Sequence, residues 1–148
     1  MRWTFLIVDA NDRDATVTTL HLQRVMPGAE IVRAITGEAA ISLMEEARLV
    51  PSMIFLDYAL PSMNGIEFLG KVRQRRWLER APVTLLSEPV DDRLVVTCYR
   101  LGAAAFLTKP VRVHELREAV RDFAIPAERM SAATTIQGTP SPISKSAA

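Results

Sequence analysis

Four residues with chemically useful side chains stand at or just beyond the ends of short apolar runs: Asp9, Asp57, Ser87 and Lys109. Two carboxylates can bind Mg²⁺ through oxygen, and a carboxylate can also act as a nucleophile that forms an aspartyl phosphate. A hydroxyl can donate a hydrogen bond to a phosphoryl oxygen, and an ammonium group neutralises phosphoryl charge. The set therefore predicts phosphoryl transfer onto Asp57, driven by positioning and charge neutralisation.

The sequence around these residues alternates between short apolar runs and amphipathic stretches. Strands are expected at residues 3–8, 30–35, 53–56, 83–86 and 104–107, and an amphipathic helix is expected after each. This alternation predicts an α/β fold, a (βα)5 arrangement in which helices cover both faces of a doubly wound parallel five-stranded sheet. The carboxyl ends of parallel strands share one edge of the sheet, so the four polar side chains are expected to meet there.

Length and composition exclude several other classes of protein. The 148 residues suffice for one domain, and the net charge of +1 gives no reason to expect nucleic acid or an anionic membrane as a partner. No apolar run approaches the roughly 20 residues that a membrane-spanning helix needs. A single cysteine, Cys98, fits a reducing compartment, so a cytoplasmic protein is expected. The organised domain is expected over residues 1–125, followed by a disordered tail or linker stub over 126–148, where Ala, Ser, Thr and Pro dominate.

The order and spacing of these motifs resemble the CheY-like receiver domain of two-component response regulators, from Trp3 to about Ala124. The matching positions are the acid Asp9, the acceptor Asp57, the loop residues Pro61 and Gly65, Ser87, Phe106 and the pair Lys109-Pro110. The resemblance implies the flavodoxin-like strand order 2-1-3-4-5. It also implies a cis peptide bond between Lys109 and Pro110.

The resemblance further implies a function and a set of site residues. Asp57 would accept a phosphoryl group from a sensor histidine kinase or a phosphotransfer protein, with Lys109 and Ser87 binding the phosphoryl oxygens. Mg²⁺ would be held by Asp9, Asp57 and the backbone carbonyl of Ala59, and Ser87 and Phe106 would form the switch. The protein would signal by binding an unknown downstream protein, with a homodimer left open, and would not be an enzyme beyond autophosphatase activity.

Two positions depart from the family pattern. The family has two adjacent acids after its first strand, whereas this chain has Asp9-Ala10, and Glu88 stands where the family has a small residue. The loss of one carboxylate predicts weakened Mg²⁺ binding. An alternative reading is therefore a degenerate receiver that acts through protein interactions without phosphorylation.

Two enzyme-like or cofactor-binding alternatives fit less well. A phosphohydrolase of the haloacid dehalogenase type needs a second Asp two residues after the nucleophile, and Ala59 occupies that position. A flavodoxin needs a Gly-, Ser- or Thr-rich phosphate-binding turn after the first strand, and residues 10–14 are acidic instead.

Overall fold

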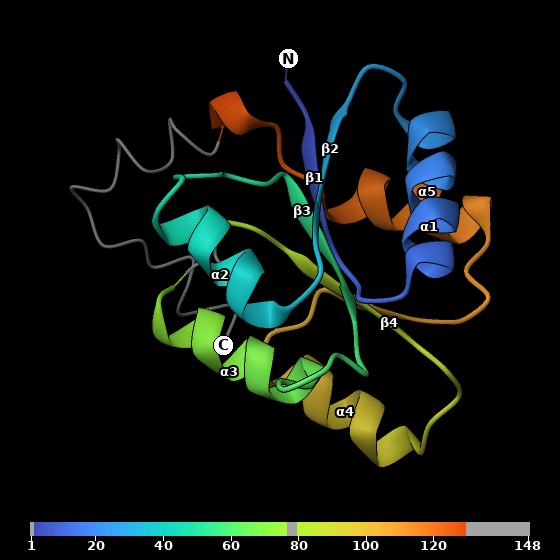
Figure 1. Ribbon diagram of the computed structural model, residues 1–148. Helices are drawn as coiled ribbons and strands as arrows, with labels where there is room; N and C mark the ends of the chain where they lie inside the picture. Colours follow the sequence, from blue (N-terminus) through green and yellow to red (C-terminus); the bar gives the residue numbers. More distant parts are fainter. Residues whose placement is uncertain (1, 77–79, 130–148) are drawn as a thin grey trace.

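The computed structural model describes residues 2–76 and 80–129, and these contain five strands and five helices in strict alternation, followed by a helical turn at residues 127–129 (Figure 1). The strands are β1 Thr4–Val8, β2 Glu30–Ala34, β3 Met53–Asp57, β4 Val83–Ser87 and β5 Ala105–Thr108. The helices are α1 Asp12–Val25, α2 Gly37–Glu45, α3 Gly65–Gln74, α4 Asp92–Arg100 and α5 Val113–Phe123. The predicted (βα)5 alternation is confirmed, and the expected strands agree with the observed ones to within one residue at each end.

All neighbouring strands are parallel, and the sheet has the order β2-β1-β3-β4-β5, as the resemblance implied. The register aligns the strand ends: Val8 pairs with Leu56, Asp57 with Leu86, and Ser87 with Thr108. The residues that end or follow β1, β3, β4 and β5 consequently lie along one edge of the sheet.

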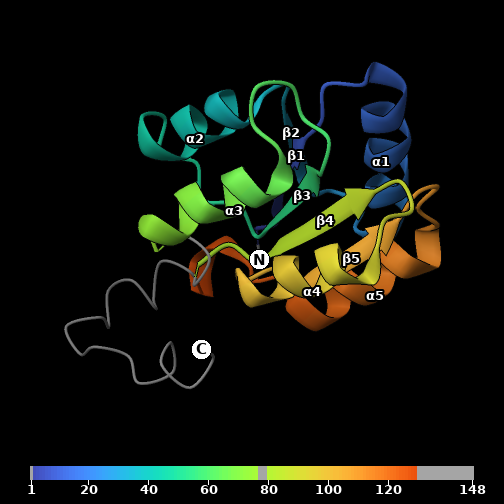
Figure 2. The ribbon, with the colours of Figure 1, turned by 90° about the horizontal axis from the view of Figure 1, so that it is seen from below.

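Helices cover both faces of the sheet (Figures 1 and 2). Helices α2, α3 and α4 contribute to one apolar core, with Leu6 and Val8 of β1 facing them, and α1 and α5 contribute to the other, with Phe5 and Ile7 facing them. The central strands β1, β3 and β4 are buried along their whole length because both faces are covered, which explains their continuous apolar runs.

Polar residues in the loops define where the site-forming helices begin. Asn11, two residues after Asp9, accepts a hydrogen bond from the N–H of Asp14 and so caps the start of α1. Asn64 and Glu67 form a reciprocal capping box that starts α3 after the loop that follows Asp57. These two caps fix where α1 begins after β1 and where α3 begins after β3.

The chain stays packed against the domain beyond residue 125, where the sequence predicts the tail to begin. Ala127 is 3% exposed and its N–H donates to the carbonyl of Arg2, while the carboxylate of Glu128 accepts from the N–H of Arg2. An apolar side chain and a backbone pairing to the N-terminus hold this segment, and neither leaves a periodic pattern in the sequence. Residues 130–148 of the predicted tail lie outside the described residues.

Two glycines of α3 allow a matched test of packing. A Cβ added at Gly65 would lie 2.8 Å from Leu85 Cδ1 and 2.9 Å from Tyr58 Cδ1, whereas nothing lies within 4 Å of a Cβ at Gly70. We expect Gly65→Ala to lower the free energy of unfolding by about 1–3 kcal/mol through overpacking. Gly70→Ala should raise it by about 0.5–1 kcal/mol because alanine is the better helix former. Chemical denaturation of both variants measures the difference, and equal effects would contradict the packing at Gly65.

Candidate functional site

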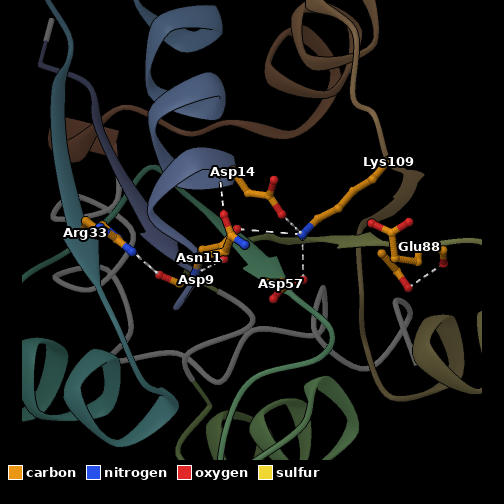
Figure 3. A network of polar contacts seen from close by, with 8 residues as sticks. Asp9, Asn11, Asp14, Arg33, Asp57, Glu88 and Lys109 are labelled. Carbon is orange, nitrogen blue, oxygen red and sulfur yellow. Dashed lines mark hydrogen bonds and ion pairs between the residues drawn. The ribbon is translucent and has the colours of Figure 1, made fainter.

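Three of the four predicted residues meet at the carboxyl edge of the sheet (Figure 3). Asp57 is the last residue of β3, Asp9 follows β1 directly, and Lys109 follows β5 directly. The Lys109 Nζ atom lies 2.9 Å from Asp57 Oδ1 and 3.8 Å from Asp9 Oδ2. Asp9 is 1% exposed and Asp57 8%, so an ammonium and two carboxylates share a largely buried pocket. The three side chains come together because the register places the carboxyl ends of β1, β3 and β5 at the same edge of the sheet.

Asp9 presents one carboxylate oxygen to the pocket. Its Oδ1 atom accepts a hydrogen bond of 2.9 Å from the N–H of Asn11, while Oδ2 is buried and has no hydrogen-bond partner within residues 2–76 and 80–129. Burial raises the pKa of Asp9, the hydrogen bond from Asn11 opposes this shift, and the like charge of Asp57 adds to it. A buried carboxylate oxygen without a hydrogen-bond donor suits a bound cation.

Lys109 supplies the positive charge of the pocket. Burial alone would lower the pKa of its ammonium group, but hydrogen bonds to Asp14 and Asp57 outweigh burial, and the pKa is raised. Lys109 is therefore positively charged at neutral pH. The peptide bond to Pro110 is cis, as the resemblance implied.

The residues present fit a Mg²⁺ ion. This ion is usually bound by one or two carboxylates together with water and phosphate oxygens, and Asp9 and Asp57 supply two carboxylates. Over the part of the chain that the structure describes, no group of three or more His, Cys, Asp or Glu side chains forms a metal site. Ala10, which follows Asp9, offers no third carboxylate. The ligand set is therefore small, and the predicted role of the Ala59 carbonyl stays a prediction.

The two predicted switch residues, Ser87 and Phe106, lie on the adjacent strands β4 and β5. Ser87 ends β4 and is 4% exposed, and its hydroxyl donates a hydrogen bond of 2.7 Å to the carbonyl of Glu88. Phe106 of β5 is half-buried against the core formed with α2, α3 and α4. The Ser87 hydroxyl is thus engaged by the backbone in this structure, and the switch roles stay predictions.

Glu88 lies at the rim of the pocket. Its side chain is exposed, and it lines a cavity of about 240 Å³ together with Lys109, Asp14 and Val17. Figure 3 shows its carboxylate beside the chain of Lys109. Glu88 therefore lies near Lys109 but outside the set of residues that pair with it.

Sequence reasoning missed two residues that complete the pocket. Asp14, in the first turn of α1, places Oδ2 2.8 Å from Lys109 Nζ. Arg33 of β2 donates to the carbonyl of Asp9 from Nε at 3.1 Å and Nη2 at 2.9 Å, and it pairs with Asp12 at 2.8 Å. Asp12 therefore points away from Asp57 and toward Arg33. The signal available for Asp14 was its position three residues after the helix cap Asn11; Arg33 carried no signal in the sequence.

The comparisons with known proteins agree with this geometry. The family model of the response regulator receiver domain matches residues 5–121. The transcriptional regulatory protein AfsQ1 of Streptomyces coelicolor is 32% identical over 120 residues, which are 81% of this chain and 51% of that protein. The transcriptional regulatory protein KdpE of Mycobacterium tuberculosis is 34% identical over 120 residues, 78% of this chain and 51% of that protein. The chain thus spans about half the length of these curated relatives.

A solved structure gives the same result. A response regulator from Chloroflexus aurantiacus superposes with a TM-score of 0.74 at 28% identity, over 83% of this chain and 98% of that one. This chain belongs to the response regulator receiver family. Receiver domains of two-component systems are signalling switches rather than conventional enzymes, and they interact with histidine kinases and downstream effectors. Within the described residues, none of the helices is long and apolar enough to cross a bilayer.

Proposed function

We propose that this chain is a phospho-accepting receiver of a two-component phosphorelay and that Asp57 takes the phosphoryl group. The observation that carries the proposal is the ammonium of Lys109 at 2.9 Å from Asp57, at the rim of the sheet and beside the Asp9 oxygen that accepts no hydrogen bond. A carboxylate with a fixed cation beside it is placed to attack phosphorus, because the cation offsets the repulsion between the two anions.

The proposed reaction uses a phosphohistidine of a sensor histidine kinase or a phosphotransfer protein as the donor. A carboxylate oxygen of Asp57 attacks phosphorus in line, and the bond between phosphorus and the ring nitrogen breaks. The ring nitrogen keeps the electron pair of that bond, and Asp57 becomes an acyl phosphate. Lys109 donates hydrogen bonds to the transferred oxygens. A Mg²⁺ ion held by Asp9 and Asp57, with the Ala59 carbonyl as a further ligand, would supply additional neutralisation of phosphoryl charge.

The proposed output is a change in Ser87 and Phe106 that a downstream protein reads. A phosphoryl oxygen on Asp57 offers the Ser87 hydroxyl a stronger acceptor than the neutral carbonyl of Glu88. Movement of Ser87 would leave space for Phe106, which is only half-buried in this structure. Binding to this form shifts the population of states, as for other phosphorylation switches. We place the protein in the cytoplasm, where such kinases present their phosphohistidine.

Mass spectrometry tests the proposal directly. The protein is incubated with Mg²⁺ and a small phosphodonor such as acetyl phosphate, and the intact mass is then measured. One added phosphoryl group, carried by the peptide that contains Asp57, is the expected result. No added mass with any donor, at any Mg²⁺ concentration, would overturn the proposal.

A degenerate receiver is the second candidate, and Ala10 is the observation that favours it. Ala10 leaves two carboxylates where the family has three, counting the acceptor. In this case the chain would bind its partner protein without forming an acyl phosphate at Asp57. The two candidates differ in the affinity for Mg²⁺, which a substitution can change.

Ala10→Asp is expected to tighten Mg²⁺ binding about tenfold or more, because affinity for such hard cations follows the number of charged oxygen ligands. Asn11→Asp is the matched control, since it adds the same charge one residue later on a side chain that caps α1. The control should change the affinity by about twofold or less, as an exposed charge does. Calorimetric titration with MgCl₂ measures both, and equal affinities for the wild type and Ala10→Asp would refute a metal-poor site.

A further inference from the structure

Asp14 reaches the pocket from α1 and not from a strand end. The cap Asn11 accepts a hydrogen bond of 2.9 Å from the N–H of Asp14, which holds the first turn of the helix in place. The Asp14 carboxylate then lies 2.8 Å from Lys109 Nζ, across the sequence separation of 95 residues. Asp12, in the same turn, pairs with Arg33 instead and has a side chain that is 91% exposed. The helix therefore directs two neighbouring carboxylates to two different cations.

Lys109 divides its hydrogen bonds between Asp14 and Asp57. An ammonium group has three N–H donors, and two of them point to these carboxylates, at 2.8 Å and 2.9 Å. The third carboxylate, Asp9, lies 3.8 Å from Nζ, beyond hydrogen-bond distance. Since Lys109 would also serve the oxygens of a phosphoryl group on Asp57, Asp14 occupies one of the three donors that this group would use.

Asp14 also changes the charge of the pocket. Three carboxylates, Asp9, Asp14 and Asp57, surround one ammonium, so the formal charge is −2 with Asp14 and −1 without it. A more negative pocket attracts a divalent cation and repels an anionic phosphodonor. The Asp14 side chain is 37% exposed and lines the cavity of about 240 Å³ beside Lys109, so its charge is open to solvent.

We propose that Asp14 is a positioning residue of the acceptor pocket: it holds Lys109 against α1, favours the metal ion, and restrains phosphoryl binding at Asp57. Asp14 adds a negative charge to the pocket, as the acid missing at Ala10 would have done. Asp14 stands one helical turn later and acts by pairing with Lys109. The proposal rests on the proposed role of Asp57 as acceptor. Asp14 thereby sets the balance between cation and phosphoryl affinity in this chain.

The test uses the full chain and the variants Asp14→Asn, Asp14→Glu and Asp12→Asn. Affinity for Mg²⁺ is measured by titration, and affinity for beryllofluoride, a phosphoryl mimic, is measured at a Mg²⁺ concentration that saturates each variant. Asp14→Asn should weaken Mg²⁺ binding and tighten beryllofluoride binding, each roughly threefold to tenfold, as for the loss of one partly exposed charge with a hydrogen bond. Asp14→Glu should retain both affinities, and Asp12→Asn should change neither, because it faces Arg33.

Nuclear magnetic resonance of the metal-free protein gives an independent readout. The Lys109 ammonium signal should shift in Asp14→Asn and stay in place in Asp12→Asn. If Asp14→Asn weakens the binding of both Mg²⁺ and beryllofluoride, Asp14 has only a structural role. If both affinities stay unchanged, Asp14 has no role in the pocket. Either result overturns the inference. Phosphoryl uptake by the wild type, measured by mass in the same series, separates failure of this inference from failure of Asp57 as the acceptor.

Discussion

Asp57→Asn is expected to abolish phosphoryl uptake completely, with no added mass after incubation with Mg²⁺ and acetyl phosphate. The amide has the same shape as the carboxylate but is neutral and does not attack phosphorus. It also removes the negative charge that lies 2.9 Å from Lys109. Because the partner carboxylates Asp9 and Asp14 remain near the ammonium, the fold should survive the substitution.

Asp12→Asn is the control for this prediction. It removes a carboxylate of the same type close to the pocket, yet Asp12 is 91% exposed and pairs with Arg33. Phosphoryl uptake by this variant should equal that of the wild type. Uptake that persists in Asp57→Asn would place the acceptor elsewhere, and a peptide map of the phosphorylated protein would identify it.

Phe55→Ala should lower the free energy of unfolding by about 3–5 kcal/mol, the usual cost of emptying a fully buried phenylalanine site. Phe55 lies in the central strand β3, is 0% exposed, and packs edge to face against Phe5 of β1 at a ring-centroid distance of 5.8 Å. Its neighbours come from a sheet that helices cover on both faces, so the structure cannot collapse into the cavity without moving a strand.

Phe123→Ala provides the comparison, since Phe123 ends α5 and is 39% exposed. We expect it to cost about 1 kcal/mol or less, in proportion to the smaller area that it buries. Urea denaturation followed by circular dichroism measures both variants. A similar loss in the two would contradict the placement of Phe55 in the core formed with α1 and α5.

The sequence alone was sufficient for the order of elements and for the place of Asp57 at the end of its strand. Apolar runs such as Met53–Asp57 predict strands that are buried on both faces, and the polar residues that end them predict a shared edge. Cys98 of α4, which the sequence places at helical spacing with Leu94 and Leu101, is fully buried. These features follow from local hydrophobicity and strand direction, and both can be read along the chain.

Only the tertiary structure decided which carboxylates share Lys109. Asp12 and Asp14 stand two residues apart in one helical turn, and the direction of each side chain depends on how α1 is rotated against the sheet. That rotation is determined by the packing of Ala15 and Leu22 against β1 and α5, which are long-range contacts. Hydrophobic periodicity locates the helix but does not say which cation each acid faces. The rotation of α1 made Asp14 a partner of Lys109, and the fold left the second oxygen of Asp9 buried without a hydrogen-bond donor.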